Sequence, residues 1–369
     1  MDKKHVYYFD WLRLISAIGV IYMHVAAGPL RSTLNLDWHL MNIVTCFAFT
    51  AVPLFLMMSG YLILNSEKTA DVSFLFKKRL PHLAIPLITW TVVAVLYRQV
   101  TSGAISFGGI FEGLVSAIQS PAWVHLWYMY SLITLYIISP LLYGGLKSLS
   151  KKGHILVFSL CCLFSAQTML QALLPEFLKP FINISILNDL FFLNGTLAIF
   201  ILGYYLGNFA KKIPNLALIG ATLALLAVII VGTYKLTVKN GQFDQTFQYQ
   251  YSGFEVVLAA CVFLLFKQNF NKPCRLFKAI PIIPLSLPIY LMHNILLSFM
   301  GFFVTAVTFW DTIYITAINL VICFVVMKTA ATIKPLCYLV TGMNYKTACE
   351  TCNWIYTFNK FKKHSKEKA

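Results

Sequence analysis

Residues 7–28 have the sequence YYFDWLRLISAIGVIYMHVAAG, an apolar stretch that nevertheless contains three ionisable side chains. A helix of about 20 apolar residues spans the hydrocarbon core of a bilayer. Ionisable groups are costly there, usually face the interior of a helix bundle, and are candidate functional residues. Here they are Asp10, Arg13 and His24. The stretch is too long for a signal peptide and lacks a small-residue cleavage site, so we expect a retained helix.

The rest of the chain is equally apolar. Of its 369 residues, 59% are hydrophobic and 11% are charged, and its mean hydropathy is +0.74. A soluble domain carries roughly 25% charged residues, so this composition excludes a soluble enzyme with a membrane tail. We predict an all-α fold, a polytopic transmembrane helical bundle of about ten spans. The spans are expected near residues 8–28, 40–64, 80–98, 123–143, 154–174, 189–209, 214–234, 252–268, 281–306 and 312–333.

The net charge of +16 comes from 29 basic and 13 acidic residues. Lys and Arg are concentrated in the cytoplasmic loops of membrane proteins, so we interpret the charge as a topology signal and expect no nucleic-acid partner. Ten spans place both termini on one side. If that side is the cytoplasm, 23 basic residues are inside and five are outside, namely Arg31, Arg98, Lys179, Lys235 and Lys239. We therefore predict a multi-pass cell-membrane protein with both termini cytoplasmic.

Two kinds of segment lie outside the predicted spans. The longer outer segments, 99–122, 175–188 and 235–251, are expected to be loops. The last of them is rich in Gln and Tyr, residues that hydrogen-bond to sugars and stack on them but are also common in wet loops with interfacial tyrosines. At the other end, residues 336–369 are basic. We expect a membrane domain over 1–335 and a cytoplasmic tail over 336–369 that lies against anionic lipid headgroups.

The nine cysteines are scattered along the chain. Cys349 and Cys352 form one CxxC motif, but no second pair matches it. Because a structural zinc site needs four ligands, we expect free thiols and no metal.

The spacing of Arg13 and His24 gives the first apolar stretch a possible chemical use. Eleven residues along a helix return to nearly the same face, displaced by about 16 Å. Both groups would face one interior groove that suits a long ligand, and a neutral imidazole is a natural general base near pH 7. Asp10 and Arg13, at i and i+3, can form a pair. The alternative is that Arg13 snorkels to the headgroups while His24 is a hydrogen-bonded core histidine.

Five motifs in order resemble the acyltransferase-3 family of integral membrane acyltransferases. The first is the Arg-x10-His pattern preceded by the Asp of DWLR. The others are VPLFLMMSGYLI (52–63), with Ser59, Gly60 and Tyr61; FKKRLPHLAIP (76–86), with Arg79 and Pro86; HLWYMYSLITLYIISPLL (125–142), with Trp127, Tyr136 and Pro140; and PIYLMHNILL (288–297), with Tyr290 and His293. The ordered set, which covers nearly the whole chain, is more specific than any one motif.

One departure from the family pattern concerns the fourth motif. A large branch of the family has two Glu residues at the positions of Leu132 and Ile133. Their absence makes the chain similar to the branch typified by the enterobacterial common antigen O-acetyltransferase, which implies a bacterial protein. It also weakens any expectation of a carboxylate-assisted acceptor site.

The resemblance implies an O-acyltransferase. The acyl group, by default acetyl, would pass from cytoplasmic acyl-CoA, a donor substrate rather than a bound cofactor, to a hydroxyl of an extracytoplasmic or lipid-linked glycan. His24 would be a general base or form an acyl-imidazole. The donor would be bound by Arg13, Lys78 and Arg79, and the acceptor by His125, Trp127, Tyr128, Tyr136 and His293, with Asp10 and Ser59 in support.

Some of these residues also have a structural interpretation that needs no role in the reaction. Lys77 and Lys78 also fit the positive-inside pattern, and Trp127 and Tyr128 also fit an aromatic belt at the membrane surface. For Ser59 we favour close helix packing at the Ser-Gly pair over a hydrogen bond to the reacting carbonyl.

A different class of protein also fits part of the pattern. A proton-coupled secondary transporter or lipid-linked-sugar flippase contains buried ionisable groups as well. Transporters usually have paired halves with interrupted helices in matching positions, and we find no such symmetry. A homo-oligomer is compatible with the sequence, because lipid-facing and protein-facing apolar surfaces look alike.

Overall fold

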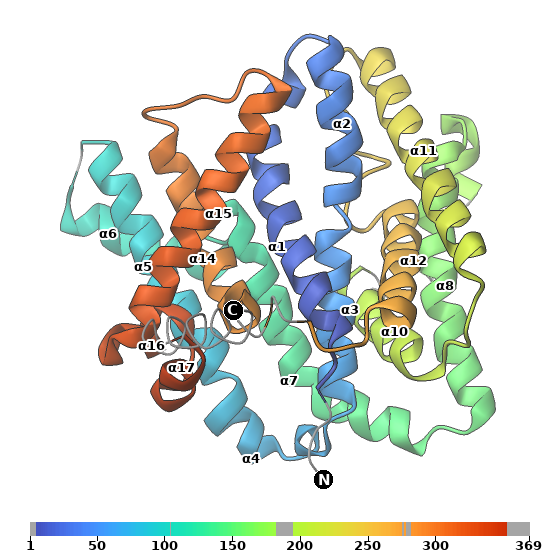
Figure 1. The fold of residues 1–369 in the computed structure, drawn as a ribbon, viewed down its shortest axis with the longest axis horizontal. Helices are drawn as coiled ribbons and strands as arrows, with labels where there is room; N and C mark the ends of the chain where they lie inside the picture. Colours follow the sequence, from blue (N-terminus) through green and yellow to red (C-terminus); the bar gives the residue numbers. More distant parts are fainter. Residues whose placement is uncertain (1–4, 104, 182–194, 275–276, 278–281, 353–369) are drawn as a thin grey trace, which may run out of the picture. The chain divides into compact units, whose positions relative to one another are not determined.

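The computed structural model describes residues 5–103, 105–181, 195–274, 277 and 282–352, and within these ranges every regular element is helical (Figure 1). Seven segments are long and apolar enough to cross a membrane: Tyr8–Ala26, Leu36–Leu64, Val72–Thr101, Phe107–Ser148, Lys151–Leu173, Asn215–Asn240 and Phe309–Thr332. Thr196–Phe209 and Pro284–Met300 are shorter apolar helices. The predicted all-α membrane fold is confirmed, whereas the count of ten spans and the side of the termini stay predictions.

Parts of several predictions lie outside the described residues. These are residues 1–4 of the predicted membrane domain, residues 104 and 182–188 of two outer loops, residues 189–194 and 281 of two predicted spans, and residues 353–369 of the predicted tail.

The chain forms two compact units, which we call unit 1 and unit 2. Unit 1 comprises Met1–Ala70, Leu141–Pro273 and Ala306–Thr316, and unit 2 comprises Asp71–Pro140, Cys274–Thr305 and Ala317–Ala369. Helices α7 (Trp127–Ser148) and α15 (Phe309–Thr332) contribute one end to each unit. Arg13 and His24 therefore belong to unit 1, whereas Arg79, His125 and His293 belong to unit 2.

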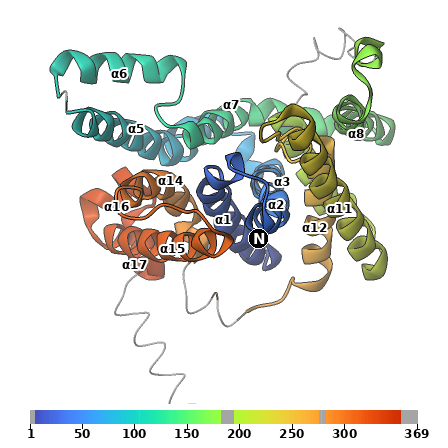
Figure 2. The same ribbon diagram turned by 90° about the horizontal axis from the view of Figure 1, so that it is seen from above.

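Unit 1 is built around α1 (Tyr8–Ala26), which packs against α2 (Leu36–Ala48) and α3 (Ala51–Leu64). Helix α3 in turn packs closely on α10 (Thr196–Phe209), and α12 (Gly253–Asn269) packs on α8 (Lys151–Leu173) and α11 (Asn215–Asn240). Figures 1 and 2 show these helices side by side. The α3–α10 contact requires Gly60, because a Cβ atom there would lie 2.6 Å from the carbonyl carbon of Phe200.

The predicted span 40–64 is two helices rather than one. Helix α2 ends at Ala48 and α3 begins at Ala51. Pro53 lies in the first turn of α3 and has no N–H to donate to the carbonyl of Phe49, four residues earlier. The proline therefore accounts for a break inside an otherwise continuous apolar segment.

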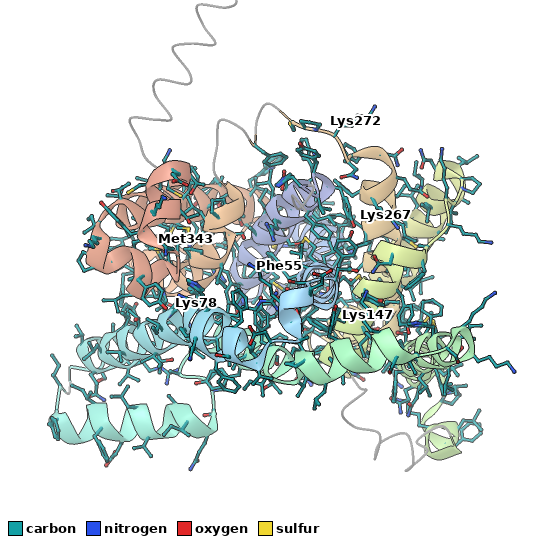
Figure 3. All side chains as sticks on the ribbon, turned by 90° about the horizontal axis from the view of Figure 1, so that it is seen from below. Phe55, Lys78, Lys147, Lys267, Lys272 and Met343 are labelled. Carbon is teal, nitrogen blue, oxygen red and sulfur yellow. The ribbon has the colours of Figure 1, made fainter. Side chains whose placement is uncertain are left out.

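Segments distant in sequence meet at one end of unit 1. The backbone N–H of Tyr7 donates to Asn271 Oδ1 (3.1 Å), and Gln268 exchanges hydrogen bonds with the backbone of Ile213. Lys267 donates to the carbonyl of Leu206 (2.8 Å). The basic residues Lys211, Lys212, Lys267 and Lys272 thus share the end at which α1 begins, and Figure 3 labels the last two. The charge pattern predicts that these residues lie at one end, and it stays a prediction that this end faces the cytoplasm.

Unit 2 contains a long helical segment that begins with α4 (Val72–Phe74) and a π-helical turn, η3 (Leu75–Arg79), and continues as α5 (Pro81–Thr101). Helices α14 (Ile282–Met300) and α16 (Lys334–Thr341) pack on α5, and α17 (Tyr345–Cys352) packs on α16. The indole of Trp90 donates to the carbonyl of Val340 (3.0 Å). Residues 336–352 of the predicted tail therefore include two helices, of which α16 packs on α5 and α17 packs on α16.

Two predicted outer loops contain regular structure. Segment 99–122 includes α6 (Phe107–Gln119), and α11 extends to Asn240 into the segment 235–251. After Asn240 the loop is held by Asp244, whose carboxylate accepts hydrogen bonds from Asn240 Nδ2 (2.7 Å) and from the backbone N–H of Thr246 (2.8 Å). Gln248, one of the Gln residues of this segment, is fully buried.

Asp244 should make the stability of this loop depend on pH. Burial raises the pKa of its carboxyl, but hydrogen bonds from Thr246 and Asn240 and the charge of Lys179 outweigh burial, so the pKa lies below its ordinary value. The ionised carboxylate therefore stabilises the folded chain above the unfolded pKa, about 3.9, and this contribution disappears as the pH falls through the folded pKa. The midpoint of thermal unfolding of the parent chain should exceed that of Asp244→Asn near neutral pH.

The difference between the two midpoints should shrink below about pH 4, where the unfolded carboxyl also becomes neutral. A difference that stays constant across this range would show that the charge of Asp244 does not stabilise the loop.

Candidate functional site

Helix α1 carries the first group of candidate residues. It is one uninterrupted helix from Tyr8 to Ala26, so Arg13 and His24 lie on nearly the same face, about 16 Å apart along the axis. Both side chains are half-buried. Ala17 and Val20, which lie between them on that face, are each only 4% exposed. The face shared by Arg13 and His24 is therefore turned into the protein.

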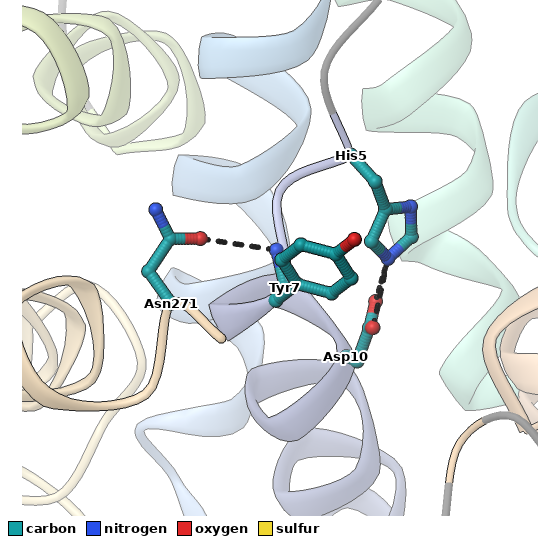
Figure 4. Close-up of polar contacts among 4 residues, drawn as sticks. All are labelled: His5, Tyr7, Asp10 and Asn271. Carbon is teal, nitrogen blue, oxygen red and sulfur yellow. Dashed lines mark hydrogen bonds and ion pairs between the residues drawn. The ribbon is translucent and has the colours of Figure 1, made fainter. Parts of the chain in front are cut away.

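Asp10 begins the same helix and has a partner that the sequence did not suggest. The Nε2 atom of His5 donates to the two oxygens of the Asp10 carboxylate, at 2.8 and 3.1 Å (Figure 4). Asp10 is buried, and Tyr7 is bound to Asn271 beside it. This arrangement fixes the start of α1 one turn before Arg13. The predicted pairing of Asp10 with Arg13 stays a prediction.

Ser59 lies on α3 next to the close contact with α10. It is half-buried, whereas Gly60 is buried against the backbone of Phe200. A second glycine, Gly203, lies on the α10 side of the same contact, where a Cβ atom would lie 2.5 Å from the carbonyl carbon of Met57. Gly60 is therefore part of a close helix contact, whereas the role of Ser59 stays a prediction.

The basic residues of unit 2 lie on the π-helical turn η3. Lys77 and Lys78 are exposed, and Figure 3 labels Lys78. Arg79 is half-buried, with its guanidinium carbon 5.5 Å from the centre of the Phe74 ring, and it interacts electrostatically with Tyr136 on α7. Single π-helical turns are frequent at functional sites. The structure thus brings together two candidates, Arg79 and Tyr136, that are far apart in sequence.

Four buried rings form a second cluster in unit 2. The ring centres of His125 and His293 are 4.9 Å apart, and Tyr290 lies 5.5 Å from His125 and 5.5 Å from Tyr128. The hydroxyl of Tyr290 donates to the backbone carbonyl of His125. Three predicted acceptor-binding residues therefore meet around Tyr290, and Trp127 is next to them, with its ring 6.1 Å from that of Tyr128.

The hydrogen bonds of the two imidazoles differ. Asn294 Nδ2 donates to Nδ1 of His125 (3.3 Å), whose Nε2–H donates to the carbonyl of Leu291 (3.2 Å). Both ring nitrogens of His125, which lies in the 3-10 turn η4 (Val124–Leu126) directly before α7, are thus used to join this turn to α14. In His293, Nδ1–H donates to the carbonyl of Tyr290 (2.5 Å), so the lone pair lies on Nε2. The Nε2 atom of a neutral His293 can therefore accept a hydrogen bond, whereas both ring nitrogens of His125 bind other residues of the protein and fix its position.

The comparison with protein families matches the acyltransferase domain of the acyltransferase-3 model to residues 6–328, which contain every candidate residue predicted from the sequence. The chain belongs to the acyltransferase-3 family. No curated protein and no solved structure matches the chain. The family and the seven candidate spans together indicate a multi-pass membrane acyltransferase.

Several polar residues of this acyltransferase-3 protein that contact the candidate residues were not singled out from the sequence. They are His5, Asn294 and Asn319, the last of which donates from Nδ2 to the carbonyl of His293 (3.0 Å). Asn294 follows His293 directly, so the PIYLMHNILL motif contained it. The contacts of His5 and Asn319 depend on how the chain folds.

Unit 1 of the acyltransferase contains a further polar cluster, around Cys46. The thiol of Cys46 lies within hydrogen-bond distance of Asn42 Oδ1 (3.3 Å) and Gln248 Oε1 (3.5 Å), which share its single hydrogen as acceptors, and it interacts electrostatically with Glu255. Glu255 is fully buried, and neither of its carboxyl oxygens has a hydrogen-bond partner among the described residues. A buried polar group without a partner costs about 1–3 kcal/mol.

Glu255→Met should therefore raise the midpoint of thermal unfolding, because methionine has a similar length and needs no hydrogen-bond partner. We expect a gain of about 1–3 kcal/mol in the free energy of unfolding. The exposed residue Glu67 supplies the control, since Glu67→Met should leave the midpoint unchanged. A lower midpoint for Glu255→Met would mean that the carboxyl is stabilised in the folded protein, by water or by a ligand.

Proposed function

We propose that this protein is an integral membrane O-acyltransferase that moves an acyl group, acetyl by default, from cytoplasmic acyl-CoA to a hydroxyl of an extracytoplasmic or lipid-linked glycan. The observation that carries the proposal is the inward-facing side of α1, with Arg13 and His24 on one face, in a chain whose residues 6–328 match the acyltransferase family model. A long ligand bound by its anionic end at Arg13 would extend along α1 toward His24.

Acyl-CoA fits the basic residues because its pyrophosphate and 3′-phosphate groups are good partners for guanidinium groups. In this proposal Arg13 and Arg79 bind phosphate, and Lys78 adds positive charge. The half-buried state of both arginines supports a binding role, since an arginine that only marks topology would extend into water. The acyl-CoA is consumed as a substrate and no bound cofactor is needed.

The reaction forms an ester bond and breaks a thioester bond. As a general base, His24 takes the proton of the acceptor hydroxyl while the hydroxyl oxygen attacks the thioester carbonyl. His24 then gives that proton to the departing CoA thiolate. In the second route His24 itself attacks the thioester carbonyl and expels the CoA thiolate, forming an acyl-imidazole. The acceptor hydroxyl then attacks this acyl group, the acyl–nitrogen bond breaks, and the hydroxyl proton passes to the released imidazole or to the thiolate. A thioester is already activated, so neither route needs a metal.

The acceptor is assigned to the aromatic and histidine residues of η4, α7 and α14. Trp127, Tyr128 and Tyr136 offer ring faces and hydroxyls to a sugar, and Nε2 of His293 offers an acceptor atom for a sugar hydroxyl. His125 supports this group by joining the two helices, because its ring nitrogens are used within the protein. Asp10 and Ser59 act by holding α1 and α3.

The orientation in the membrane follows from the same proposal. Both termini and the basic end of unit 1 face the cytoplasm, where acyl-CoA is made, and the chain crosses the membrane ten times. The absence of Glu at positions 132 and 133 supports the bacterial branch that resembles the enterobacterial common antigen O-acetyltransferase. Membrane lipids surround the protein, and association of copies is compatible with this arrangement.

The proposal is tested with inverted membrane vesicles that contain the protein. Acetyl-CoA labelled in its acetyl group is supplied to the cytoplasmic face, and label is counted in the lipid and glycan fractions. His24→Ala and Arg13→Ala are measured beside the parent chain. Label that needs the protein and disappears with His24→Ala would support acyl transfer and would identify the chemical fraction that contains the acceptor.

The absence of protein-dependent label, with several acyl-CoAs and acceptor-rich membranes, would overturn the proposal. The transporter or flippase would then become the favoured function, and uptake of labelled lipid-linked sugar into the same vesicles would be measured next.

A further inference from the structure

Helix α6 was expected to be part of a water-exposed loop, and its surface does not fit that expectation. Phe107, Phe111, Val115 and Ile118 are 87%, 61%, 42% and 80% exposed. At 100° per residue they lie on one side of the helix, and we call them the α6 stripe. Glu112, Ser116 and Gln119 are also exposed but lie on a different side. The helix therefore has separate apolar and polar exposed surfaces.

A third side of α6 is packed on α5, and the packing shows the direction of the helix. Gly109 lies against the side chain of Gln99, where a Cβ would be 2.7 Å from the amide, and Gly113 lies against Val95, where a Cβ would be 2.8 Å from a methyl group. Residue numbers rise along α6 as they fall along α5, so the two helices are antiparallel. Helix α6 thus returns along the last turns of a candidate membrane span, Val72–Thr101.

The neighbourhood of α6 has the residues of a membrane surface. Tyr97 and Trp123 have ring centres 5.4 Å apart, and the guanidinium carbon of Arg98 lies 5.7 Å from the Trp123 ring. Tyr and Trp are enriched where a bilayer meets water, and an arginine at a helix end reaches the headgroups. The apolar exposed surface of α5 adjoins this cluster through Leu96 and Val100.

We propose that α6 is embedded in the outer part of the bilayer and that the α6 stripe contacts lipid acyl chains. Leu96 and Val100 add exposed apolar surface on the adjacent α5, and in this proposal the polar side with Glu112 and Ser116 faces headgroups and water. Apolar helices of 10–14 residues are typical of interfacial or re-entrant segments. Figures 1 and 2 show α6 at the outside of unit 2 beside α5, and the exposed fractions of the stripe residues show that no described segment covers them.

Tryptophan fluorescence in brominated lipid tests this proposal. Phe111→Trp places a reporter on the stripe, and Ser116→Trp places the matched reporter on the polar side of the same helix. Each full-length variant is reconstituted in phosphatidylcholine vesicles with and without brominated acyl chains, and its emission is compared with that of the parent chain, which has seven tryptophans. Ile118→Trp repeats the stripe measurement if Phe111→Trp does not fold.

The fluorescence of the tryptophan introduced at position 111 should be quenched by brominated acyl chains and should not be quenched by acrylamide dissolved in the water. The emission added at position 116 should behave in the opposite way. Quenching of the tryptophan at position 111 by acrylamide alone would mean that this side of α6 is exposed to water, and it would overturn the proposal. Protection of position 111 from both quenchers would also overturn it, because the stripe would then be covered by protein, such as a second copy of the chain.

Discussion

Replacing His24 by alanine is expected to lower the rate of acyl transfer by about 10²- to 10⁴-fold, the usual contribution of a general base. His24 is the only histidine of α1, it shares the inward-facing side of that helix with Arg13, and its imidazole is the group proposed to handle the proton of the acceptor hydroxyl. Label transferred from acetyl-CoA in inverted vesicles measures the rate. The midpoint of thermal unfolding is recorded for the same preparation, so that lost activity is not confused with lost folding.

Two variants make this result specific. Met23→Ala removes a half-buried neighbour of His24 on α1 and should retain activity. Arg13→Ala should act on donor binding, raising KM for acetyl-CoA by roughly 10- to 100-fold, as expected for the loss of a charged hydrogen bond. Near-parental activity of His24→Ala would contradict a catalytic role for this residue and leave the core-histidine interpretation.

The chemical route of His24 requires a separate measurement. An acyl-imidazole would add one acetyl group to the peptide that contains His24 when the enzyme is quenched during turnover without acceptor. General-base catalysis leaves that peptide unmodified. Mass spectrometry of the quenched peptide therefore distinguishes the two routes that the sequence leaves open.

The membrane fold and the α1 candidates could be predicted because both depend on local spacing. Apolar length alone identifies helices such as Tyr8–Ala26 and Asn215–Asn240, and the face shared by Arg13 and His24 follows from the helical period. The α2–α3 break was also encoded locally, since Pro53 lacks the N–H that a continuous helix would use. We did not predict it because apolar composition favours one long span.

Other features could not be predicted because they depend on contacts between distant segments. The His5–Asp10 pair requires the N-terminal segment to fold back on α1. The polar cluster at Cys46 requires Gln248, which lies in the loop after α11, to reach α2. Helix α6 was missed for a different reason. The helical spacing of Phe107, Phe111, Val115 and Ile118 was present in the sequence, but we treated segment 99–122 as a polar loop because Gly, Glu and Ser residues lie between them.

Gly60→Ala is expected to destabilise unit 1 strongly and to lower the midpoint of thermal unfolding. The added Cβ would meet the backbone of Phe200, whose carbonyl carbon would lie 2.6 Å away and whose oxygen would be closer still. Backbone atoms cannot rotate away as a side chain can, so α3 and α10 would have to separate. Overpacking costs typically 1–3 kcal/mol and occasionally more, and we expect about 3 kcal/mol here. Gly203→Ala, on the facing helix, should have a similar effect.

The matched control is Gly220→Ala on α11, where an added Cβ meets nothing within 4 Å. Because alanine favours a helix over glycine by about 1 kcal/mol, this variant should raise the midpoint that Gly60→Ala lowers. The same chemical change would then have opposite signs at two helical positions, and only the α3–α10 contact explains the difference. Equal midpoints for the two variants would mean that α3 and α10 do not approach each other this closely. In that case Ser59 and Gly60 would need a role other than packing, and the hydrogen bond from Ser59 to the reacting carbonyl would become the better interpretation.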